Sequence, residues 1–398
     1  MRVGILTFHS QLNYGGILQC WALQTALEKM GHKVVVIDRW LDENNWLLNR
    51  NYPKSFWKLR KKTILRSILG LGDYRFFERV QRTRKFLSEK LHLTQYHFYE
   101  WKDAPQDLGV DIVVVGSDQV WHVTWQHSRF YLLEDAPASL RRISYAASIG
   151  LPELPEEFVS YFKSALANFD AISCRESEGC DICRKLGFDA TYVLDPTLLL
   201  DTNDWLKLVR LSSKEYLQPA KKKLLCYFLS EDVDKNLPLL DAFAKRNNCE
   251  ISILVFDTQR KQDLLPLPSS PHNLWKWGKG VVNRLSSQTH ICESAGPLEF
   301  VREHATATWV ITDSFHSLMF SFIFNKNCRV IRPMTHDRMK MFSRIEEMVN
   351  HSQGKIITES FQSALNSIVN DETISYDKNW IKSEKQASIC FLEKNLSI

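Results

Sequence analysis

The stretch Trp309-Val-Ile-Thr-Asp-Ser-Phe-His-Ser-Leu-Met-Phe320 carries the pattern that decides the fold of this chain. Four apolar residues form a strand, a polar turn follows, and a helix is expected to begin at Phe315. In open parallel sheets ligands collect at the carboxyl ends of strands, and the free amides of a helix N-terminus favour anions. His316 lies at that helix start, where a histidine can serve as an acid or base near neutral pH. A capping or core histidine is the structural alternative.

The same order of strand, turn and helix occurs at the start of the chain. A strand over residues 2–7 leads through Asn13-Tyr14-Gly15-Gly16 into a helix over 17–30, and a strand over 33–38 follows. Such a unit implies a parallel pair of strands. Further strands are predicted at 112–115, 143–146, 171–174 and 191–194, with helices at 155–169 and 176–186. The first half is therefore predicted to be α/β and doubly wound.

A second series of elements begins after a charged region, residues 203–223. Strands are predicted at 224–229, 251–256, 309–312 and 329–331, and helices at 234–246, 297–304 and 315–324. A chain of 398 residues exceeds one comfortable core, so two α/β domains are expected. We assign them to residues 1–200, with a basic helical insertion at about 54–90, and to residues 220–350. Residues 351–398 are expected to form a helical segment that packs back on the first domain.

Composition narrows the class of protein. A hydrophobic content of 44%, a charged content of 24% and a net charge of +5 describe an ordinary soluble protein, for which nucleic acid is not the expected partner. No apolar run reaches 18 residues, and the N-terminal apolar run is too short for a signal peptide. Nine scattered cysteines suit a reducing compartment, so a cytoplasmic location is expected. The single pair Cys180-Asp-Ile-Cys183 lacks a second pair at zinc spacing, and no metal is expected.

Two loops at predicted strand ends carry candidate binding groups. The turn Asn13-Tyr14-Gly15-Gly16 could cradle a ligand with its backbone amides, or its glycines could serve only a tight turn. The stretch Gly116-Ser-Asp-Gln-Val-Trp121 places a hydroxyl, a carboxylate and an amide together, which suits hydrogen bonds to sugar hydroxyls, with Trp121 available for stacking. Alternatively, Asp118 is a helix cap and Trp121 a core residue.

Arg175 stands at a further strand end, in Ile172-Ser-Cys-Arg-Glu-Ser177. Its planar guanidinium group could clamp a carboxylate or a phosphate. An ion pair with Glu176 or Asp195 is the structural alternative.

The segment between Lys54 and Lys85 is strongly basic, with eleven lysines or arginines against two acidic residues. Aromatic and aliphatic residues are interleaved with these charges. A basic amphipathic helix of this kind can lie on an anionic membrane surface. A solvated basic face over an ordinary apolar contact is the alternative.

Seven motifs, taken in this order, resemble the polysaccharide pyruvyl transferase family. They are Gly4-Ile-Leu-Thr7 with Asn13-Tyr-Gly-Gly-Ile-Leu-Gln19, the stretch 111–121, Ser144-Tyr-Ala-Ala-Ser-Ile-Gly150, Ser173-Cys-Arg-Glu176, Leu194-Asp-Pro-Thr-Leu198, Gly296-Pro-Leu-Glu-Phe300 and Thr312-Asp-Ser-Phe-His-Ser317. They span about residues 1 to 345. Each piece alone is weak, and their order makes the resemblance specific.

The resemblance implies two Rossmann-like domains in a GT-B-like arrangement, with the active site in the cleft between them. It also implies a transferase that moves pyruvate from phosphoenolpyruvate onto two sugar hydroxyls, forms a cyclic ketal and releases phosphate, without a metal or organic cofactor. Arg175 matches the arginine that holds the donor in this family, and His316 matches its general acid. Asp118 is the carboxylate best placed to orient or deprotonate the sugar hydroxyls.

The remaining site residues are assigned to donor or acceptor. Expected donor-binding residues are Arg175, Ser314, Lys326, Arg338 and Arg344, and expected acceptor-binding residues are Asn13, Tyr14, Gly15, Gly16, Ser117, Gln119 and Trp121. One departure from the family matters here. Many members have Arg-Leu-His where this chain has Ser314-Phe315-His316, so a neighbouring base must take over from the missing arginine. The candidates are Lys326, Arg329, Arg332, Arg338 and Arg344.

The expected acceptor is a hexose such as galactose in a lipid-linked precursor of a capsular or other surface polysaccharide. The basic segment 54–85 would then dock the protein on the inner face of the membrane. A glycosyltransferase of the same build that uses a nucleotide sugar is the leading alternative, although Gly296-Pro-Leu-Glu299 only weakly imitates the ribose-binding turn of such enzymes. A catalytically silent carbohydrate-binding protein is the second alternative.

Overall fold

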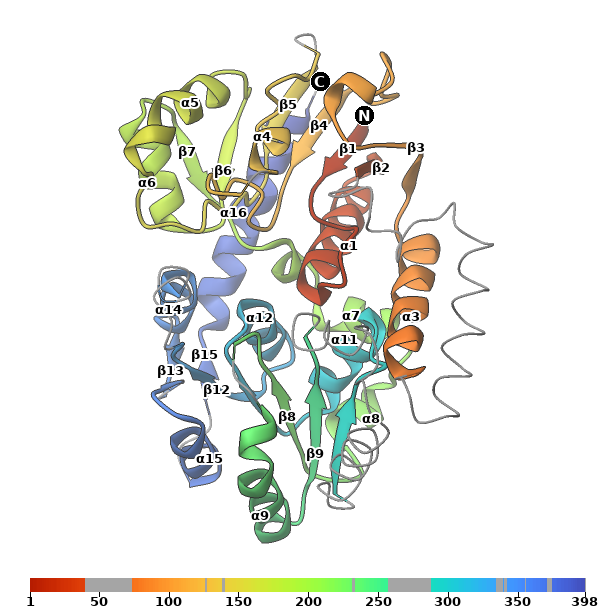
Figure 1. Cartoon of the computed structure of the whole chain (residues 1–398), viewed down its shortest axis with the longest axis vertical. Coiled ribbons are helices and arrows are strands. Elements are labelled where there is room, and N and C mark those ends of the chain that lie inside the picture. The colour runs from red at the N-terminus through yellow and green to blue at the C-terminus, as the bar shows by residue number, and fades with distance from the viewer. Residues whose placement is uncertain are drawn as a thin grey trace, which may run out of the picture.

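The molecule is built on two parallel β-sheets, one in the upper half and one in the lower half of the view in Figure 1. The computed structural model describes residues 1–39, 74–125, 127–137, 140–230, 233–256, 288–333, 339, 342–354, 356–370 and 374–397. Within these ranges, no helix has the length and apolar character that crossing a membrane requires.

The first sheet has the strand order β3-β2-β1-β4-β5, and every pair of neighbours is parallel. Its strands are β1 (Arg2–Leu6), β2 (Lys33–Arg39), β3 (Leu93–Phe98), β4 (Ile112–Val115) and β5 (Arg141–Ser144). All four residues of β4 are buried, as expected for a strand covered on both faces. The strand order reverses between β1 and β4, so the loops that follow these two strands meet at the switch point where such sheets bind ligands.

A short pair of strands, β6 (Ile172–Cys174) and β7 (Ala190–Tyr192), continues this half beyond β5. A parallel bridge between Ile143 and Ala171 links the two parts. The helices of this half are α1 (Tyr14–Lys29), α3 (Tyr74–Lys90), α4 (Ser128–Tyr131), α5 (Glu156–Leu166) and α6 (Ser177–Lys185), with the 3-10 turn η1 (Trp101–Asp103).

The second sheet has the order β10-β9-β8-β11-β12-β14, again all parallel, which is the strand order of the Rossmann fold. Its strands are β8 (Lys223–Tyr227), β9 (Glu250–Leu254), β10 (Thr289–Cys292), β11 (Trp309–Thr312), β12 (Asn327–Ile331) and β14 (Ile357–Thr358). Its helices are η3 (Val233–Asn236), α9 (Leu237–Asn247), α11 (Pro297–Thr306), α12 (Phe315–Ile323), α14 (Ser343–Val349) and α15 (Phe361–Asn370). The switch point lies between β8 and β11, and α12 begins there.

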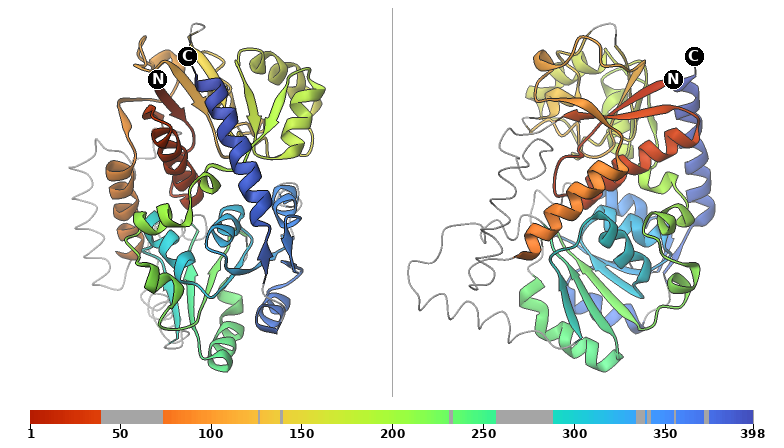
Figure 2. Two further views of the ribbon diagram at one scale, coloured as in Figure 1. Left: turned by 180° about the vertical axis from the view of Figure 1, so that it is seen from behind. Right: turned by 90° about the vertical axis from the view of Figure 1, so that its right-hand side faces the viewer.

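The two halves are joined by η2 (Pro196–Leu199), α7 (Thr202–Leu208) and α8 (Ser213–Leu217), and by the long α16 (Lys378–Leu396). The short strands β13 (Ser352–Gln353) and β15 (Ser375–Tyr376) pair just before α16. Figure 2 shows α16 crossing from the second half to the first. Midway along α16, Ser388 Oγ accepts a hydrogen bond from the Leu194 amide at 2.9 Å. The largest apolar cluster includes residues of α1, η2, α12 and α16, so one core runs through both halves.

The predicted α/β architecture is confirmed, and the strands at 112–115 and 309–312 were predicted to the residue. The strands β3 and β10 were not predicted. Both are edge strands, and polar residues interrupt them, as in Thr289-His-Ile-Cys292, so neither presents the continuous apolar run of a central strand. Residues 54–73 of the predicted basic insertion lie outside the described residues, and the rest of it forms most of α3.

Candidate active site

The turn before α1 brings the first half into contact with His316. The Asn13 side chain accepts hydrogen bonds from the amides of Gly15 at 3.1 Å and Gly16 at 3.4 Å, and so caps the helix. A Cβ atom on Gly15 would lie 2.1 Å from His316 Nδ1, and one on Gly16 would lie 3.2 Å from Asp118 Oδ2. The two glycines therefore permit close approach, and Gly15 is the contact between α1 and the histidine.

Tyr14 holds the two halves together. Its hydroxyl donates a hydrogen bond to the Ala295 carbonyl at 3.0 Å, and its ring stacks on Phe300 with centroids 4.8 Å apart. The guanidinium carbon of Arg79 lies 4.8 Å from the same ring. Tyr14 is buried by these contacts, so its side chain serves the interface between the halves instead of facing an acceptor.

The loop after β4 presents Asp118 to the site and buries Trp121. Asp118 has a φ of 71°, and its Oδ1 accepts a hydrogen bond from the Gln119 amide at 2.9 Å. Ser117 Oγ donates to the Ala146 carbonyl at 2.8 Å. Trp121 is 0% exposed and packs edge-on against Phe162. This placement corrects the prediction that Trp121 stacks on an acceptor, because the core covers the whole ring.

Arg175 is the buried centre of a cluster of carboxylates. Its Nη1 donates to Asp195 Oδ2 at 3.1 Å, and its other nitrogens lie 3.7 Å from Asp118 Oδ1 and 3.9 Å from Glu176 Oε2. Burial by itself lowers the pKa of Arg175, but Asp118, Asp195 and Glu176 outweigh burial and raise that pKa. Among the described residues, Arg175 Nε and Nη2 have no hydrogen-bond partner although they are buried.

Asp195 connects Arg175 to His316. Its Oδ1 accepts hydrogen bonds from the Thr197 amide at 3.0 Å and hydroxyl at 2.7 Å, while Oδ2 faces Arg175 and lies 3.7 Å from His316 Nε2. Burial raises the pKa of Asp195, but His316, Arg175 and the Thr197 amide together hold it below its usual range. The carboxylate is therefore ionised at neutral pH and can stabilise a positive charge on the imidazole.

His316 lies in the first turn of α12. The first intrahelical bond there runs from the Leu318 amide to the Ser314 carbonyl, at 3.1 Å, so the amides before Leu318 point out of the helix start. Ser314 is the N-cap residue, and its own amide donates to Thr312 Oγ1 at 3.0 Å. His316 Nε2 is buried and has no hydrogen-bond partner in the part of the chain that the structure describes.

Arg344, from α14, completes the cluster. Its guanidinium carbon lies 5.3 Å from the centre of the Phe315 ring, and that of Arg175 lies 4.7 Å from the same ring. Burial lowers the pKa of Arg344 to about 10, and the positive charge of Arg175 acts in the same direction. Arg344 Nε is another buried donor without a partner among the described residues.

The other basic candidates do not reach this cluster where the structure describes them. Lys326 follows the far end of α12, where its Nζ lies 4.8 Å from the Tyr216 ring and burial lowers its pKa to about 8. Arg329 donates to the Ser367 carbonyl at 3.1 Å, and Arg332 pairs with Glu346 at 2.8 Å. Arg338 lies outside the described residues.

Four residues of the site were given no direct role by the sequence. Asp195 and Glu176 were considered only as ion-pair partners of Arg175. His122 and Trp125 were not singled out, yet their rings stack with centroids 4.5 Å and planes 13° apart, and Trp125 is 40% exposed. The presence of a second tryptophan, Trp125, four residues after Trp121 was the available signal, but only the packing shows which tryptophan faces outward.

His122 links this aromatic pair to the charged cluster. A Cβ on Gly150 would lie 3.2 Å from His122 Cδ2, and the Gly150 amide donates to Glu176 Oε1 at 3.0 Å. Burial lowers the pKa of His122, and the charge of Arg344 adds to this effect. Within the described residues, no group of three or more histidine, cysteine, aspartate or glutamate side chains is arranged to hold a metal ion. The arrangement is thus a cluster of mixed charge, with buried guanidinium and imidazole nitrogens that lack partners among the described residues, beside an exposed indole.

Comparison with known proteins identifies relatives at two levels. The sequence model of the polysaccharide pyruvyl transferase family matches residues 13–333, which is most of the chain. A comparison with curated proteins gave no significant match.

Solved structures establish the fold. The UDP-GlcNAc 2-epimerase from Methanocaldococcus jannaschii is 14% identical with a TM-score of 0.52, and the match covers 98% of this chain and 99% of that one. A putative UDP-N-acetylglucosamine 2-epimerase from Listeria monocytogenes is 10% identical with a TM-score of 0.52, and the match covers 99% of this chain and 97% of that one. Identities this low speak for the fold alone, which is the GT-B arrangement of two α/β halves.

Proposed function

This chain belongs to the polysaccharide pyruvyl transferase family, and we propose that it moves pyruvate from phosphoenolpyruvate onto two hydroxyls of one sugar, releasing phosphate. The main support is the placement of Arg175 and Arg344, which both lie against Phe315 beside His316. Both arginines have buried nitrogen atoms without a hydrogen-bond partner among the described residues. Buried polar groups are rarely left unsatisfied, and guanidinium donors match carboxylate and phosphate oxygens. An anionic donor would satisfy these atoms.

Phosphoenolpyruvate carries both a carboxylate and a phosphate, so it needs more than one cationic group. Arg175 comes from the first half and Arg344 from the second, and the first-turn amides of α12 add a third set of donors. Arg344 takes the place of the arginine that many family members carry two residues before the histidine. We assign it this role because, of the described candidates, it alone lies on Phe315.

His316 in its protonated form acts as the acid. It delivers its proton to the methylene carbon of phosphoenolpyruvate, and the neighbouring carbon gains cationic character. A sugar hydroxyl attacks that carbon, and Asp118 takes the hydroxyl proton, which gives a tetrahedral adduct. Asp195 holds the imidazolium, since its Oδ2 lies 3.7 Å from His316 Nε2.

Loss of phosphate then completes the reaction. The carbon–oxygen bond to phosphate breaks, the second hydroxyl of the sugar attacks the same carbon, and the ring closes as a ketal. One hydroxyl proton replaces the proton that His316 gave to carbon, and the other leaves with phosphate. Placing two hydroxyls against one carbon is mainly an orientation task, which residues from two halves can perform together.

The acceptor is a hexose, such as galactose, of a lipid-linked or polymeric surface-polysaccharide precursor. The exposed face of Trp125, held by stacking on His122, supports this proposal because an indole offers a flat apolar surface to a sugar ring. Trp125 thus takes the stacking role first assigned to Trp121.

Membrane contact through the basic segment stays a prediction for residues 54–73, which lie outside the described residues. Two basic residues of α3 contact other parts of the protein. Arg79 donates to the Leu12 carbonyl at 2.9 Å, and Arg82 pairs with Glu299 at 3.2 Å. These contacts support a structural role for α3.

The test incubates the purified protein with phosphoenolpyruvate and a panel of lipid-linked or aryl hexosides, and follows phosphate release together with a mass gain of one pyruvyl ketal. The variant His316→Gln should lower turnover by about 10²-fold or more, the usual contribution of a positioned acid. Near-wild-type turnover would remove His316 from the mechanism.

Binding measurements separate the alternatives. Thermal stabilisation by phosphoenolpyruvate supports the proposal, whereas stabilisation by nucleotide sugars in its place would favour a glycosyltransferase. Failure to bind either kind of donor would favour a carbohydrate-binding protein without catalysis.

A further inference from the structure

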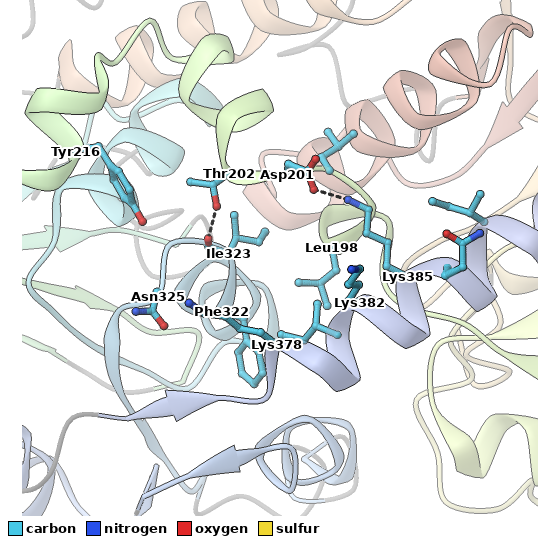
Figure 3. Close-up of a pocket in the computed structure, with 14 residues that line it drawn as sticks. Leu198, Asp201, Thr202, Tyr216, Phe322, Ile323, Asn325, Lys378, Lys382 and Lys385 are labelled. Carbon is cyan, nitrogen blue, oxygen red and sulfur yellow. Dashed lines mark hydrogen bonds and ion pairs between the residues drawn. The ribbon is translucent and has the colours of Figure 1, made fainter.

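A second pocket, of about 640 Å³, lies at the junction of the two halves, and none of the site residues lines it (Figure 3). Its walls come from the connection formed by η2 and the residues that follow it, from Tyr216 of α8, from the end of α12, and from one face of α16. This volume falls in the range of pockets that hold small organic ligands. The pocket therefore has the size of a ligand site and no role in the proposed reaction.

The interior of the pocket is apolar. Leu198 and Leu200 line it from the connection, Phe322 and Ile323 from α12, and Ile381 and Ile389 from α16. A hydrogen bond of 2.7 Å from Thr202 Oγ1 to the Ile323 carbonyl fixes the connection against α12. An apolar wall of this kind favours a hydrocarbon chain over a sugar or a nucleotide.

The lining of α16 is basic. Lys378, Lys382 and Lys385 are spaced by four and three residues, so they share one face of the helix, and all three line the pocket. Lys385 pairs with Asp201 at 2.5 Å, whereas Lys378 and Lys382 make no ion pair within the described structure. Asp201 is the one acidic residue among the lining residues, so positive charge prevails.

We propose that this pocket binds an amphiphile with one apolar chain and an anionic end. The chain lies against the leucine, isoleucine and phenylalanine wall, and the anion lies between Lys378 and Lys382. Both a phosphate and a carboxylate fit this description, so the shared chemistry is an anionic group on a hydrocarbon chain. The proposal concerns a different site from that of the pyruvyl transfer and does not depend on it.

The position of the pocket suggests how binding is detected. The segment η2, which lines the pocket with Leu198, directly follows Asp195. Helix α12 lines the pocket with its last turn and carries His316 in its first turn. A ligand seated there touches α12 of the second half and the segments that join the two halves. A ligand that binds the folded chain and not the unfolded chain raises the temperature of unfolding. The same ligand can therefore be followed by calorimetry and by thermal shift.

The experiment measures binding of dodecyl phosphate, below its critical micelle concentration, to the full chain by isothermal titration calorimetry. The variant Lys378→Ala/Lys382→Ala should weaken binding by about tenfold or more, the effect of removing charge-assisted hydrogen bonds. Lys394→Ala is the matched control, because Lys394 is an exposed lysine of the same helix that does not line this pocket. Dodecanol and inorganic phosphate should each bind more weakly than dodecyl phosphate, since each lacks one half of the recognised group.

A second variant tests the apolar wall without touching charge. Gln386 lines the pocket from α16, and Gln386→Trp should obstruct it and reduce dodecyl phosphate binding. Comparison with dodecanoate then tells which anionic end is preferred. Equal binding of dodecyl phosphate to the wild type, the double lysine variant and Gln386→Trp would overturn the proposal, as would the absence of binding to the wild type.

Discussion

Asp195 lies between the arginine and the histidine of the charged cluster. Its Oδ1 accepts hydrogen bonds from the Thr197 amide and hydroxyl. Its Oδ2 accepts a hydrogen bond from Arg175 and lies 3.7 Å from His316 Nε2. Because those partners come from different segments, the carboxylate fixes both Arg175, the proposed donor-binding cation, and His316, the proposed acid. Asp195 is the N-cap residue of η2, and the amide of the preceding Leu194 is hydrogen-bonded to Ser388. These contacts hold the backbone on both sides of Asp195.

Arg344 should be required for donor binding. The variant Arg344→Gln removes a guanidinium group that lies 5.3 Å from Phe315, and we expect the affinity for phosphoenolpyruvate to fall by about tenfold to a hundredfold, as for the loss of one or two charged hydrogen bonds. Isothermal titration with phosphoenolpyruvate measures this. Arg332→Gln is the control, because Arg332 pairs with Glu346 instead of reaching the cluster. An equal loss in both variants would contradict the assignment.

Gly15 should tolerate no side chain. In Gly15→Ala the new methyl group would lie 2.1 Å from His316 Nδ1, so the imidazole must leave the position that it holds beside Asp195. We expect turnover to fall by at least about tenfold while the fold is retained, since alanine is a good helix residue. Gly16→Ala gives a graded comparison, with its nearest contact at 3.2 Å. If Gly15→Ala were the milder of the two in steady-state kinetics, the close approach would not matter.

At the scale of elements, α11 and α12 meet through a buried histidine. His304 Nδ1 lies 2.8 Å from the Phe300 carbonyl, to which it must donate, so Nε2 accepts from Ser317 Oγ at 2.7 Å. This network uses the neutral imidazole. Burial lowers the pKa of His304 to about 4, although the bond to the Phe300 carbonyl opposes that change.

The folding stability should therefore depend on pH through His304. Its contribution is intact above about pH 6.5 and is lost as the pH falls toward about 4, because the unfolded chain takes up a proton that the folded chain refuses. The free energy of unfolding should fall by about 3 kcal/mol over this pH range, because each unit of pKa difference is worth roughly 1.4 kcal/mol. Urea unfolding of the wild type and of His304→Gln, between pH 7 and pH 4.5, measures it. The variant should show the shallower dependence, and identical slopes would refute the argument.

The elements also show how far sequence patterns reach. Apolar runs predicted β4 and β11 and placed Asp118, Arg175 and His316 just after strands. The expectation that these residues share one cleft came from the family resemblance. The pattern could not select Arg344 from five basic candidates, because its reach to Phe315 depends on how α14 packs on α12. Nor could it separate Trp121 from Trp125, since both lie in one loop and only tertiary packing buries the first.

At the scale of the whole molecule, α16 fastens the two halves. His351 stacks on Trp380 near the helix start, with centroids 3.6 Å apart, and Arg141 donates to the Asn395 carbonyl at 3.3 Å near its end. Phe391, Leu392 and Leu396 are buried in the core that both halves share. The stability of each half thus includes the packing of this one helix.

Leu392→Ala should destabilise the whole chain. Leu392 is fully buried, and removing its side chain leaves a cavity that costs about 2–5 kcal/mol. Chemical denaturation measures the free energy of unfolding, and hydrogen exchange should show faster opening on both sides of the helix. Glu393→Ala, at the neighbouring exposed position, should change stability by less than about 0.5 kcal/mol. A loss confined to one half would mean that α16 serves that half alone.

The contact between Gly15 and His316 joins residues of opposite halves, with the imidazole in the space that a methyl group would fill. Arg175 and its three carboxylates belong to the first half, and the histidine to the second. His316 and the carboxylate that stabilises its positive charge, Asp195, therefore come from different halves. In the proposed reaction, His316 can therefore give its proton beside Arg175 and Asp118 only while the two halves are in contact.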